Sequence, residues 1–437
     1  MQVDSENKNN RVMIVYPIVS GGGNVNPDWR LQETIGLAKA INLQTVHYEY
    51  VNLKVVKSAT LFGQGVIDRL HDVIHEKEVG LFIVDSSLSP IQQRNLEKKL
   101  NIKVIDRTAL ILEIFGARAR TFEGKLQVEL AHLTYQRSRL VRAWTHLERQ
   151  RGGFGFIGGP GESQLEIDRR LADDTISKIK RKIERVKKTR SLQRKARKRV
   201  PYPVVAIVGY TNAGKSSLFN HLTGSDVFAK DLLFATLDPT MRLLKLPCGT
   251  NIILSDTVGF ISDLPYDLVA SFRATLEEVV SADVILHIRD LSSLEFDNHG
   301  NDVMQILDNL NVNKDNKPII EVWNKCDIID DDKRYVIENQ LLTQDDKYIC
   351  SVYDNYGIQQ ILQSVSDALH NNDQKYLVEL PLSAGAENSW IKSKSRLLSE
   401  EYDESGASLI VEMPIEISGK FYVKFPDTNV KISQIEK

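Results

Sequence analysis

The chain has 437 residues, a formal net charge of −2 and three cysteines. This length predicts two to four domains, each able to bury a core of its own. The polar first residues and the lack of a run of about 18 apolar residues indicate neither secretion nor membrane spanning, so we expect a cytoplasmic protein. Cys248, Cys326 and Cys350 have no metal-like spacing and are too few for a disulfide framework.

Residues 11–106 alternate short apolar runs with stretches of helical periodicity. Val12–Tyr16 and Gly80–Asp85 have the composition of buried strands. The alternation predicts a small parallel α/β unit. The segment Gly63–Val66 contains a lone G-x-G, which predicts a turn. We assign no second nucleotide site to it, because Val66 cannot contact a phosphate as a lysine would.

Residues 107–200 predict a long antiparallel helical hairpin. Leu126–Gln150 and Arg169–Arg199 carry apolar residues at near-helical spacing, and a glycine-rich segment with two aromatic residues, 152–163, connects them. The second helix holds fifteen Lys or Arg and three acidic residues, a net charge of +12 in 31 residues. Such a helix repels itself unless a polyanion screens it, which favours contact with RNA over a merely solvated hairpin.

The string GYTNAGKS at 209–216 fits the phosphate-binding pattern G-x-x-x-x-G-K-[ST]. It follows the apolar run 204–208, which is typical of a buried strand, and precedes the helical run 217–222. We expect backbone N–H groups of the loop to hold the β-phosphate, Lys215 to bridge the β- and γ-phosphates, and Ser216 to bind Mg²⁺. The nucleotide-binding residues predicted here are Gly209, Tyr210, Thr211, Asn212, Ala213, Gly214, Lys215 and Ser216.

A loop with two threonines follows at 234–240. One threonine hydroxyl should complete the Mg²⁺ shell and order the loop around the γ-phosphate. The residues alone do not separate Thr236 from Thr240, and the alternative is that both cap a turn before a strand. The nucleotide contacts predicted in this loop are Phe234, Ala235, Thr236, Leu237 and Asp238.

The string Asp256-Thr257-Val258-Gly259 directly follows an apolar run, so Asp256 falls at the carboxyl end of a strand, where open α/β sheets bind ligands. We expect Asp256 to hold Mg²⁺ through a water and Gly259 to let a backbone N–H approach the γ-phosphate. The next residue is Phe260, where a Ras-like enzyme has the glutamine that orients the attacking water. Hydrolysis is therefore either slow or completed by another part of the chain, a bound cation or a partner.

A guanine-reading motif, Asn324-Lys325-Cys326-Asp327, follows the strand-like run 318–323. The Asp327 carboxylate can accept both N–H donors on the edge of guanine, whereas adenine offers no such pair. The motif therefore predicts GTP and disfavours an ATP-dependent RNA helicase. We expect Asn324 beside the base and Lys325 along its face. A less specific string that should complete the base pocket is Ser351, Val352 and Tyr353.

Residues 375–437 predict a small α+β domain. Tyr376–Leu380, Ser408–Glu412 and Lys420–Lys424 have the composition of strands, and residues 386–402 that of a helix. The whole chain is predicted to be a multidomain α/β protein. Its predicted units are an N-terminal α/β subdomain at 1–106, the long basic helical hairpin at 107–200, a P-loop GTPase domain at 201–371 and a small C-terminal α+β domain at 375–437.

Several long strings resemble one known family: DRTALILEIFGARAR at 106–120, GGPGESQLEIDRRL at 158–171, GYTNAGKSSLFNHLT at 209–223 and DTVGFISDLP at 256–265. On these strings, residues 107–370 resemble the HflX family of translational GTPases. The resemblance implies binding to the large ribosomal subunit and its RNA, with the hairpin reaching toward the peptidyl-transferase region. It also implies nucleotide-dependent splitting or rescue of stalled ribosomes, and it favours Thr236, with Ser216, as the Mg²⁺ ligand.

Two hypotheses follow. In the first, the protein is a monomeric, ribosome-activated GTPase with Mg²⁺ as cofactor, and Lys215, Thr236 and Gly259 act in the hydrolysis of GTP to GDP and phosphate. In the second, it is an RNA-binding remodelling or anti-association factor whose nucleotide only tunes affinity. Substitution of Lys215 or Asp256 by alanine separates the two, because only the first requires the nucleotide cycle.

Overall fold

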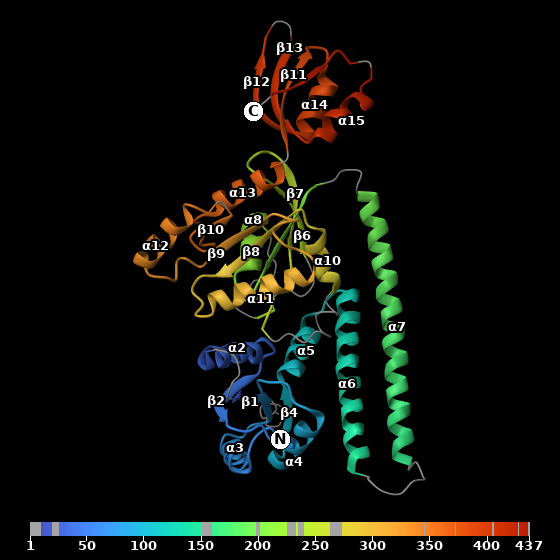
Figure 1. Ribbon diagram of the computed structural model, residues 1–437, viewed down its shortest axis with the longest axis vertical. Coiled ribbons are helices and arrows are strands. Elements are labelled where there is room, and N and C mark those ends of the chain that lie inside the picture. Colours follow the sequence, from blue (N-terminus) through green and yellow to red (C-terminus); the bar gives the residue numbers. More distant parts are fainter. Residues whose placement is uncertain are drawn as a thin grey trace, which may run out of the picture.

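The computed structural model describes residues 10–19, 26–150, 160–197, 202–224, 233–234, 240–262, 273–344, 346–371, 373–403, 406–426 and 428–435. This part of the chain holds three β-sheets and a pair of long helices (Figure 1). The predicted multidomain α/β fold class is confirmed. None of the described helices combines the length and the apolar composition that a membrane span needs.

The N-terminal unit is a parallel sheet with helices on both faces. Its elements are β1 (Arg11–Val19), α2 (Pro27–Ala40), β2 (Gln44–Leu53), α3 (Gln64–Glu76), β3 (Leu81–Val84), α4 (Pro90–Leu100), β4 (Lys103–Asp106) and α5 (Arg107–Arg118). The strand order is β2-β1-β3-β4. Residues Val12–Val15 of β1 are fully buried, because α2 and α5 pack on one face of the sheet and α3 and α4 on the other.

The two long helices are α6 (Phe122–Gln150) and α7 (Pro160–Arg197), and they run side by side as the predicted hairpin requires (Figure 1). Leu126 of α6 packs against Ile179 and Ile183 of α7. The predicted glycine-rich connection is shorter than expected, because α7 already begins at Pro160. Proline suits a first helical turn, where its missing N–H would have no helical partner. Residues 151–159 of the connection lie outside the described part of the chain.

The domain predicted to be the GTPase domain is a six-stranded sheet in the order β10-β9-β8-β5-β7-β6, in which only β6 runs antiparallel to its neighbour. Its strands are β5 (Val204–Gly209), β6 (Thr240–Lys245), β7 (Asn251–Asp256), β8 (Val284–Asp290), β9 (Ile319–Asn324) and β10 (Lys347–Ile349). The helices are α8 (Lys215–Thr223), α10 (Arg273–Ser281), α11 (Phe296–Asn309), α12 (Asp331–Leu341) and α13 (Ile358–His370). Because β5, β7 and β9 are parallel, the three predicted nucleotide motifs meet at one edge.

The C-terminal unit is an antiparallel sheet with two helices (Figure 1). Its elements are β11 (Gln374–Pro381), α14 (Gly385–Lys394), β12 (Arg396–Tyr402), β13 (Gly406–Met413), α15 (Ile415–Lys424) and β14 (Lys431–Gln434). The strand order β12-β13-β11-β14 together with the chain order βαββαβ is the split βαβ topology.

Two predicted elements of this unit are wrong. The helix expected over 386–402 ends at Lys394, and β12 takes up the rest by pairing with β13. The strand expected at Lys420–Lys424 is the last part of α15. The apolar side chains there pack with helical rather than strand periodicity, since Ile417, Phe421 and Phe425, four residues apart, share one core.

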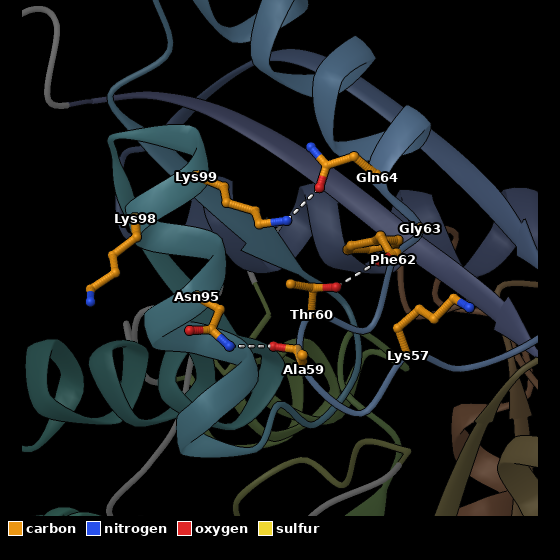
Figure 2. Close-up of a pocket in the computed structure, with 9 residues that line it drawn as sticks. All are labelled: Lys57, Ala59, Thr60, Phe62, Gly63, Gln64, Asn95, Lys98 and Lys99. Carbon is orange, nitrogen blue, oxygen red and sulfur yellow. Dashed lines mark hydrogen bonds between the residues drawn. The ribbon is translucent and has the colours of Figure 1, made fainter.

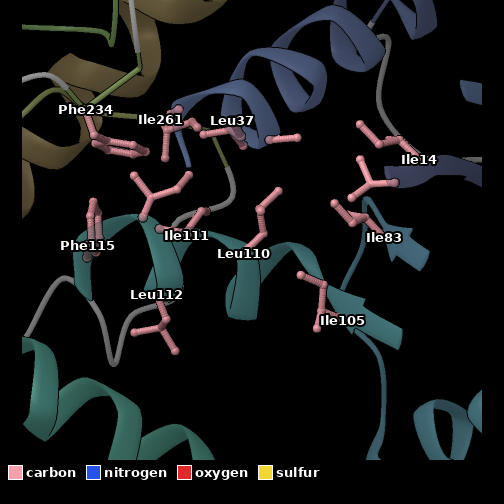
Figure 3. Close-up of a cluster of buried hydrophobic side chains, with 14 of the residues drawn as sticks. Ile14, Leu37, Ile83, Ile105, Leu110, Ile111, Leu112, Phe115, Phe234 and Ile261 are labelled. Carbon is pink, nitrogen blue, oxygen red and sulfur yellow. The ribbon is translucent and has the colours of Figure 1, made fainter. Parts of the chain in front are cut away.

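One hydrophobic core joins the N-terminal unit to the GTPase domain (Figure 3). Phe115 and Ile111 of α5 face Phe234 and Ile261, which belong to the GTPase domain. The rings of Phe115 and Phe234 meet edge to face with centroids 4.7 Å apart. Burying one such ring contributes about 2 kcal/mol. The two units are therefore packed as one body around this core.

Candidate functional site

The loop between β5 and α8 makes a tight turn that two glycines permit. Gly209 and Gly214 have φ angles of 151° and 96°. A Cβ at Gly209 would collide with the carbonyl oxygen of Ile288, and one at Gly214 with the side-chain amide of Asn324. Gly214 also precedes the first turn of α8, whose N–H groups face into the loop. The loop has the form of an anion cradle.

Lys215 lies inside this cradle. Its side chain is buried, and Nζ donates to the carbonyl oxygen of Tyr210 at 2.6 Å. Burial lowers the pKa of Lys215 to about 8, although the Asp256 carboxylate opposes that shift. An arriving phosphate would restore the pKa toward its ordinary value. The ammonium group is thus positioned to bind an anion that is not part of the chain.

Ser216 and Asp256 bring two oxygen ligands together beside the cradle. Both residues are buried, and Ser216 Oγ donates to Asp256 Oδ2 at 2.7 Å. A hydroxyl and a carboxylate are the hard donors that Mg²⁺ takes together with phosphate oxygens and waters. Within the described part of the chain, no three His, Cys, Asp or Glu side chains are grouped to hold a metal. The donor set of Ser216 and Asp256 therefore fits Mg²⁺ bound along with a nucleotide.

The loop at 234–240, which is predicted to order around the γ-phosphate and is called the switch loop below, is described only in part. Thr236, Ala235, Leu237 and Asp238 lie outside the described residues. Phe234 is described, and its ring is buried against Phe115. Its side chain thus points into the interdomain core, so any contact with a nucleotide would use its backbone.

The segment after β7 crosses directly over the cradle. A Cβ at Gly259 would lie 2.9 Å from Lys215 Nζ and from Thr211 Cγ2, so glycine is required for this approach. Thr257 Oγ1 donates to the carbonyl oxygen of Ile207 at 2.7 Å, and the neighbouring Val258 packs against the interdomain core. The 256–259 motif is therefore fixed at its start and passes over the lysine at its end.

Phe260 is held by the backbone and turned away from the cradle. Its N–H donates to Gly209 O at 3.1 Å, and its carbonyl oxygen accepts from Thr211 N at 2.7 Å. The ring is buried with Val208 and Leu276 on the other side. The position after the DxxG motif therefore supplies no polar side chain for an attacking water.

Asn324 connects the segments of the expected base pocket. Its Nδ2 donates to Ala213 O at 2.9 Å, and its Oδ1 accepts from Val352 N at 3.3 Å. Its side chain thus ties the phosphate loop to the 351–353 segment. Lys325 has a positive φ of 67° and pairs with Asp290 at 2.7 Å.

The remaining base-pocket candidates differ in exposure. Asp327 is exposed, whereas Cys326 is buried and donates its N–H to Cys350 O at 3.2 Å. Ser351 is fully buried and its hydroxyl accepts from Asp354 N at 3.0 Å. Tyr353 is 91% exposed. Of these residues, Asp327 and Tyr353 are open to solvent, whereas Cys326 and Ser351 are not.

Sequence reasoning missed a buried polar network behind the cradle. The Tyr210 hydroxyl bonds to Glu33 of α2 and to Ser262 Oγ at 2.9 Å, and the ring stacks on His299 with centroids 3.8 Å apart. Arg107 of α5 pairs with Glu33 and also donates to Ser262 O at 3.3 Å. No local pattern could have revealed it, because Tyr210 and Glu33 are 177 residues apart.

A separate hollow of about 510 Å³ lies in the N-terminal unit at the predicted Gly63–Val66 turn (Figure 2). Two of its polar side chains are bonded within the lining: Asn95 donates to Ala59 O at 2.9 Å, and Lys99 bonds to Gln64. Val66 packs toward the core of that unit and brings no cation. Three lysines, Lys57, Lys98 and Lys99, line the hollow, but all three are exposed, whereas Lys215 of the cradle is buried.

The arrangement at this sheet edge defines a P-loop GTPase. A glycine loop after a β-strand holds a buried lysine, a DxxG segment crosses that loop, and an NKxD motif lies on the same edge. The chain matches three family models, described as GTP-binding GTPase N-terminal (28–116), GTP-binding GTPase Middle Region (118–197) and 50S ribosome-binding GTPase (204–325). It belongs to the HflX family of GTPases and is a GTP hydrolase.

Individual relatives extend over nearly the whole chain. GTPase HflX of Magnetococcus marinus is 47% identical over 390 residues, covering 89% of each chain. GTPase HflX of Escherichia coli is 39% identical over 386 residues, covering 88% of this chain and 90% of that one. Among solved structures, a GTP-binding protein from Sulfolobus solfataricus in complex with GDP is 22% identical, with a TM-score of 0.45, and covers 83% of this chain and 99% of that one.

Proposed function

We propose that this protein binds the large ribosomal subunit through ribosomal RNA, hydrolyses GTP there, and thereby splits or rescues stalled ribosomes. The family match to a 50S ribosome-binding GTPase supports the partner. The observation that carries the proposal is the distribution of charge on α7.

The two long helices present a cationic surface of the kind that binds RNA. Ile176, Ile179 and Ile183 of α7 are buried. The cations Lys178, Lys180, Arg181, Lys182 and Arg185 are exposed, and within the described part of the chain they pair with no carboxylate. Because the apolar stripe is used by α6, the basic side of α7 remains for phosphates.

For the nucleotide, we propose that Lys215 bridges the β- and γ-phosphates, that the N–H of Gly259 contacts the γ-phosphate, and that Asp327 reads guanine. Ser216 and Thr236 would hold Mg²⁺, with Asp256 behind it. Magnesium, when bound, neutralises charge on the phosphate oxygens. The remaining residues of the 209–216, 234–238, 256–259, 324–327 and 351–353 segments would surround the nucleotide.

The turned-away ring of Phe260 supports a catalytic role for the ribosome. Phosphoryl transfer depends on positioning the attacking water and neutralising charge, and this position provides neither. A group from the bound ribosome would complete the site. The GTPase would then be slow in solution and fast on its target, which is the behaviour of a factor released by hydrolysis.

The competing hypothesis, in which nucleotide only tunes RNA affinity, is tested by Lys215→Ala. Ribosome splitting by the variant and by the wild-type protein is followed by light scattering with GTP present. If the proposal holds, the rate of nucleotide-dependent cycling and the rate of repeated splitting both fall by about 100-fold or more in Lys215→Ala. Lys99→Ala, which removes an exposed lysine far from the cradle, is the matched control and should split normally. Full splitting by Lys215→Ala would overturn the proposal in favour of the second hypothesis.

A further inference from the structure

Two consecutive residues, Asp106 and Arg107, lie where the N-terminal sheet, the helical hairpin and the GTPase domain meet. Asp106 ends β4 and caps α5, which begins at Arg107. The two residues are only 2% and 3% exposed. A buried carboxylate or guanidinium is tolerated only when its hydrogen bonds are satisfied. The partners of these two side chains therefore show what the pair holds in place.

The Asp106 carboxylate fixes the first helix of the hairpin. Tyr135 of α6 donates its hydroxyl to Asp106 Oδ1 at 2.8 Å, and Arg139, one turn further along α6, donates to Oδ2 at 3.1 Å. The same two oxygens accept the N–H groups of Ala109 and Leu88. The Arg139 guanidinium also lies over the Tyr135 ring, 4.7 Å from its centroid. Asp106 thus ties α6 to the end of β4.

The Arg107 side chain reaches the GTPase domain instead. Its guanidinium pairs with Glu33 of α2 and donates to the carbonyl oxygen of Ser262 at 3.3 Å. The N–H and Oγ of Ser262 both bond to the Tyr210 hydroxyl, at 2.8 and 2.9 Å. The carbonyl oxygen of Tyr210 accepts from Lys215 Nζ at 2.6 Å. A series of hydrogen bonds therefore leads from Arg107 to the segment after the DxxG motif and on to the lysine of the phosphate cradle.

The two residues divide these contacts between them. Among the described residues, the Asp106 side chain bonds to the hairpin and the Arg107 side chain to the GTPase domain, and neither bonds to the partners of the other. One planar peptide unit joins them, so a shift of Asp106 carries Arg107 with it. Hydrogen bonds weaken steeply with angle, whereas the apolar contacts of α5 have no preferred direction. The pair therefore responds to the position of α6 more sharply than the surrounding core does.

We propose that Asp106 and Arg107 are positioning residues for GTP hydrolysis. RNA bound to the hairpin sets the position of α6, and the pair transmits that position to the segment after the DxxG motif and to the loop that holds Lys215. This inference rests on the function proposed above, because it names the route by which the large ribosomal subunit accelerates hydrolysis. The ribosome supplies the polar group that Phe260 lacks, and Asp106 and Arg107 place the nucleotide site to receive it.

The test is GTP hydrolysis by Tyr135→Phe, which removes one hydroxyl from Asp106 and keeps the ring. The rate is measured without large ribosomal subunits and at saturating subunits, and the affinity for subunits is measured by sedimentation. We expect an unchanged basal rate, an unchanged affinity, and a stimulation that is smaller by about tenfold. Tyr376→Phe is the matched control. Its buried hydroxyl bonds to Gln374 at 3.1 Å in the C-terminal unit, and its loss should leave stimulation unchanged.

Arg107→Lys tests the other half of the pair, since lysine keeps the charge and loses the fork that reaches Glu33 and Ser262. Its stimulation should also fall, and the double variant with Tyr135→Phe should lose less than the product of the two separate losses, because both act on one route. Tyr135→Phe decides the question if Arg107→Lys folds poorly.

Two results would overturn the inference while leaving the proposed function intact. One is full stimulation of Tyr135→Phe by the subunits that stimulate the wild-type protein. The other is a double variant whose two losses simply multiply, which would place the residues on separate routes. A wild-type protein that large subunits do not stimulate would instead remove the proposed function, and this inference with it.

Discussion

Tyr210 occupies an unspecified position of the phosphate-loop motif, yet it is the residue that connects this loop to the N-terminal unit. Its hydroxyl accepts from Ser262 N at 2.8 Å and bonds to Glu33. Burial raises the pKa of Tyr210 well above its ordinary value, so the hydroxyl stays protonated at neutral pH. One hydroxyl therefore joins the phosphate loop to α2 and to the segment that follows the DxxG motif.

Behind Tyr210, Arg107 holds the carboxylates in place. Burial alone would lower the pKa of Arg107, but Glu33 and Asp85 raise it above its ordinary value. Arg107 lies 2.9 Å from Asp85, which also pairs with Arg30 at 3.0 Å. Removing one member of so buried a network leaves the others without a partner, and the cost is that of an unsatisfied buried group.

Tyr210→Phe should therefore destabilise the protein by about 1–3 kcal/mol, because Glu33 and the N–H of Ser262 lose a buried partner. The measurement is the shift of the urea unfolding midpoint. Tyr353→Phe is the matched control, since that side chain is 91% exposed, and it should change stability by no more than about 0.5 kcal/mol. Equal midpoints for the two variants would show that the network contributes nothing to the packing of the units.

Among the elements, α7 carries the proposed interaction with RNA. Replacing Lys178, Lys182 and Arg185 by glutamate should weaken binding to large ribosomal subunits and lower the salt dependence of the affinity. The slope of log K against log salt should fall by about 0.7–0.9 for each phosphate that the variant no longer neutralises. The same charge reversal at Lys57, Lys98 and Lys99 alters net charge equally in the N-terminal unit and serves as control. Equally weakened binding by both triple variants would contradict a specific role for α7.

Elements with a strong local signal were predictable from the sequence. The runs before GYTNAGKS, DTVG and NKCD are β5, β7 and β9, because short apolar segments buried on both faces are recognisable without tertiary information. In contrast, Lys420–Lys424 has the composition of a strand but is helical. Its secondary structure depends on the packing of Phe421 with Ile417 and Phe425. Composition does not encode such partners.

The candidate site likewise has residues that a sequence motif predicts and residues whose role depends on contacts between distant segments. Gly214, Lys215 and Asp256 were placed by motif and lie together, because the spacing of the motif follows from the loop itself. The scaffolding role of Asn324 was not predicted, because it depends on hydrogen bonds to Ala213 and Val352 from distant segments. The contacts of Tyr210 with Glu33 likewise require the folded arrangement of two units.

At the scale of the whole molecule, the nucleotide edge of the GTPase sheet faces the N-terminal unit. Phe234, the first residue of the predicted switch loop, and Ile261, shortly after the DxxG motif, share one core with α5 (Figure 3). α5 leads directly into α6 and so into the helical hairpin (Figure 1). Segments expected to move with the γ-phosphate thus share a core with α5 and α6, and α6 in turn packs against the basic helix α7.

If the ribosome completes a GTPase site that the chain leaves incomplete, GTP hydrolysis must depend on the ribosome. The decisive experiment measures hydrolysis by the purified protein with and without large ribosomal subunits, and repeats it after deletion of residues 150–165. We predict slow hydrolysis alone, stimulation of about 100-fold or more by the subunit, and loss of that stimulation on deletion. Fast hydrolysis without ribosomes that the deletion leaves unchanged would contradict this mechanism and place the missing catalytic group within this chain.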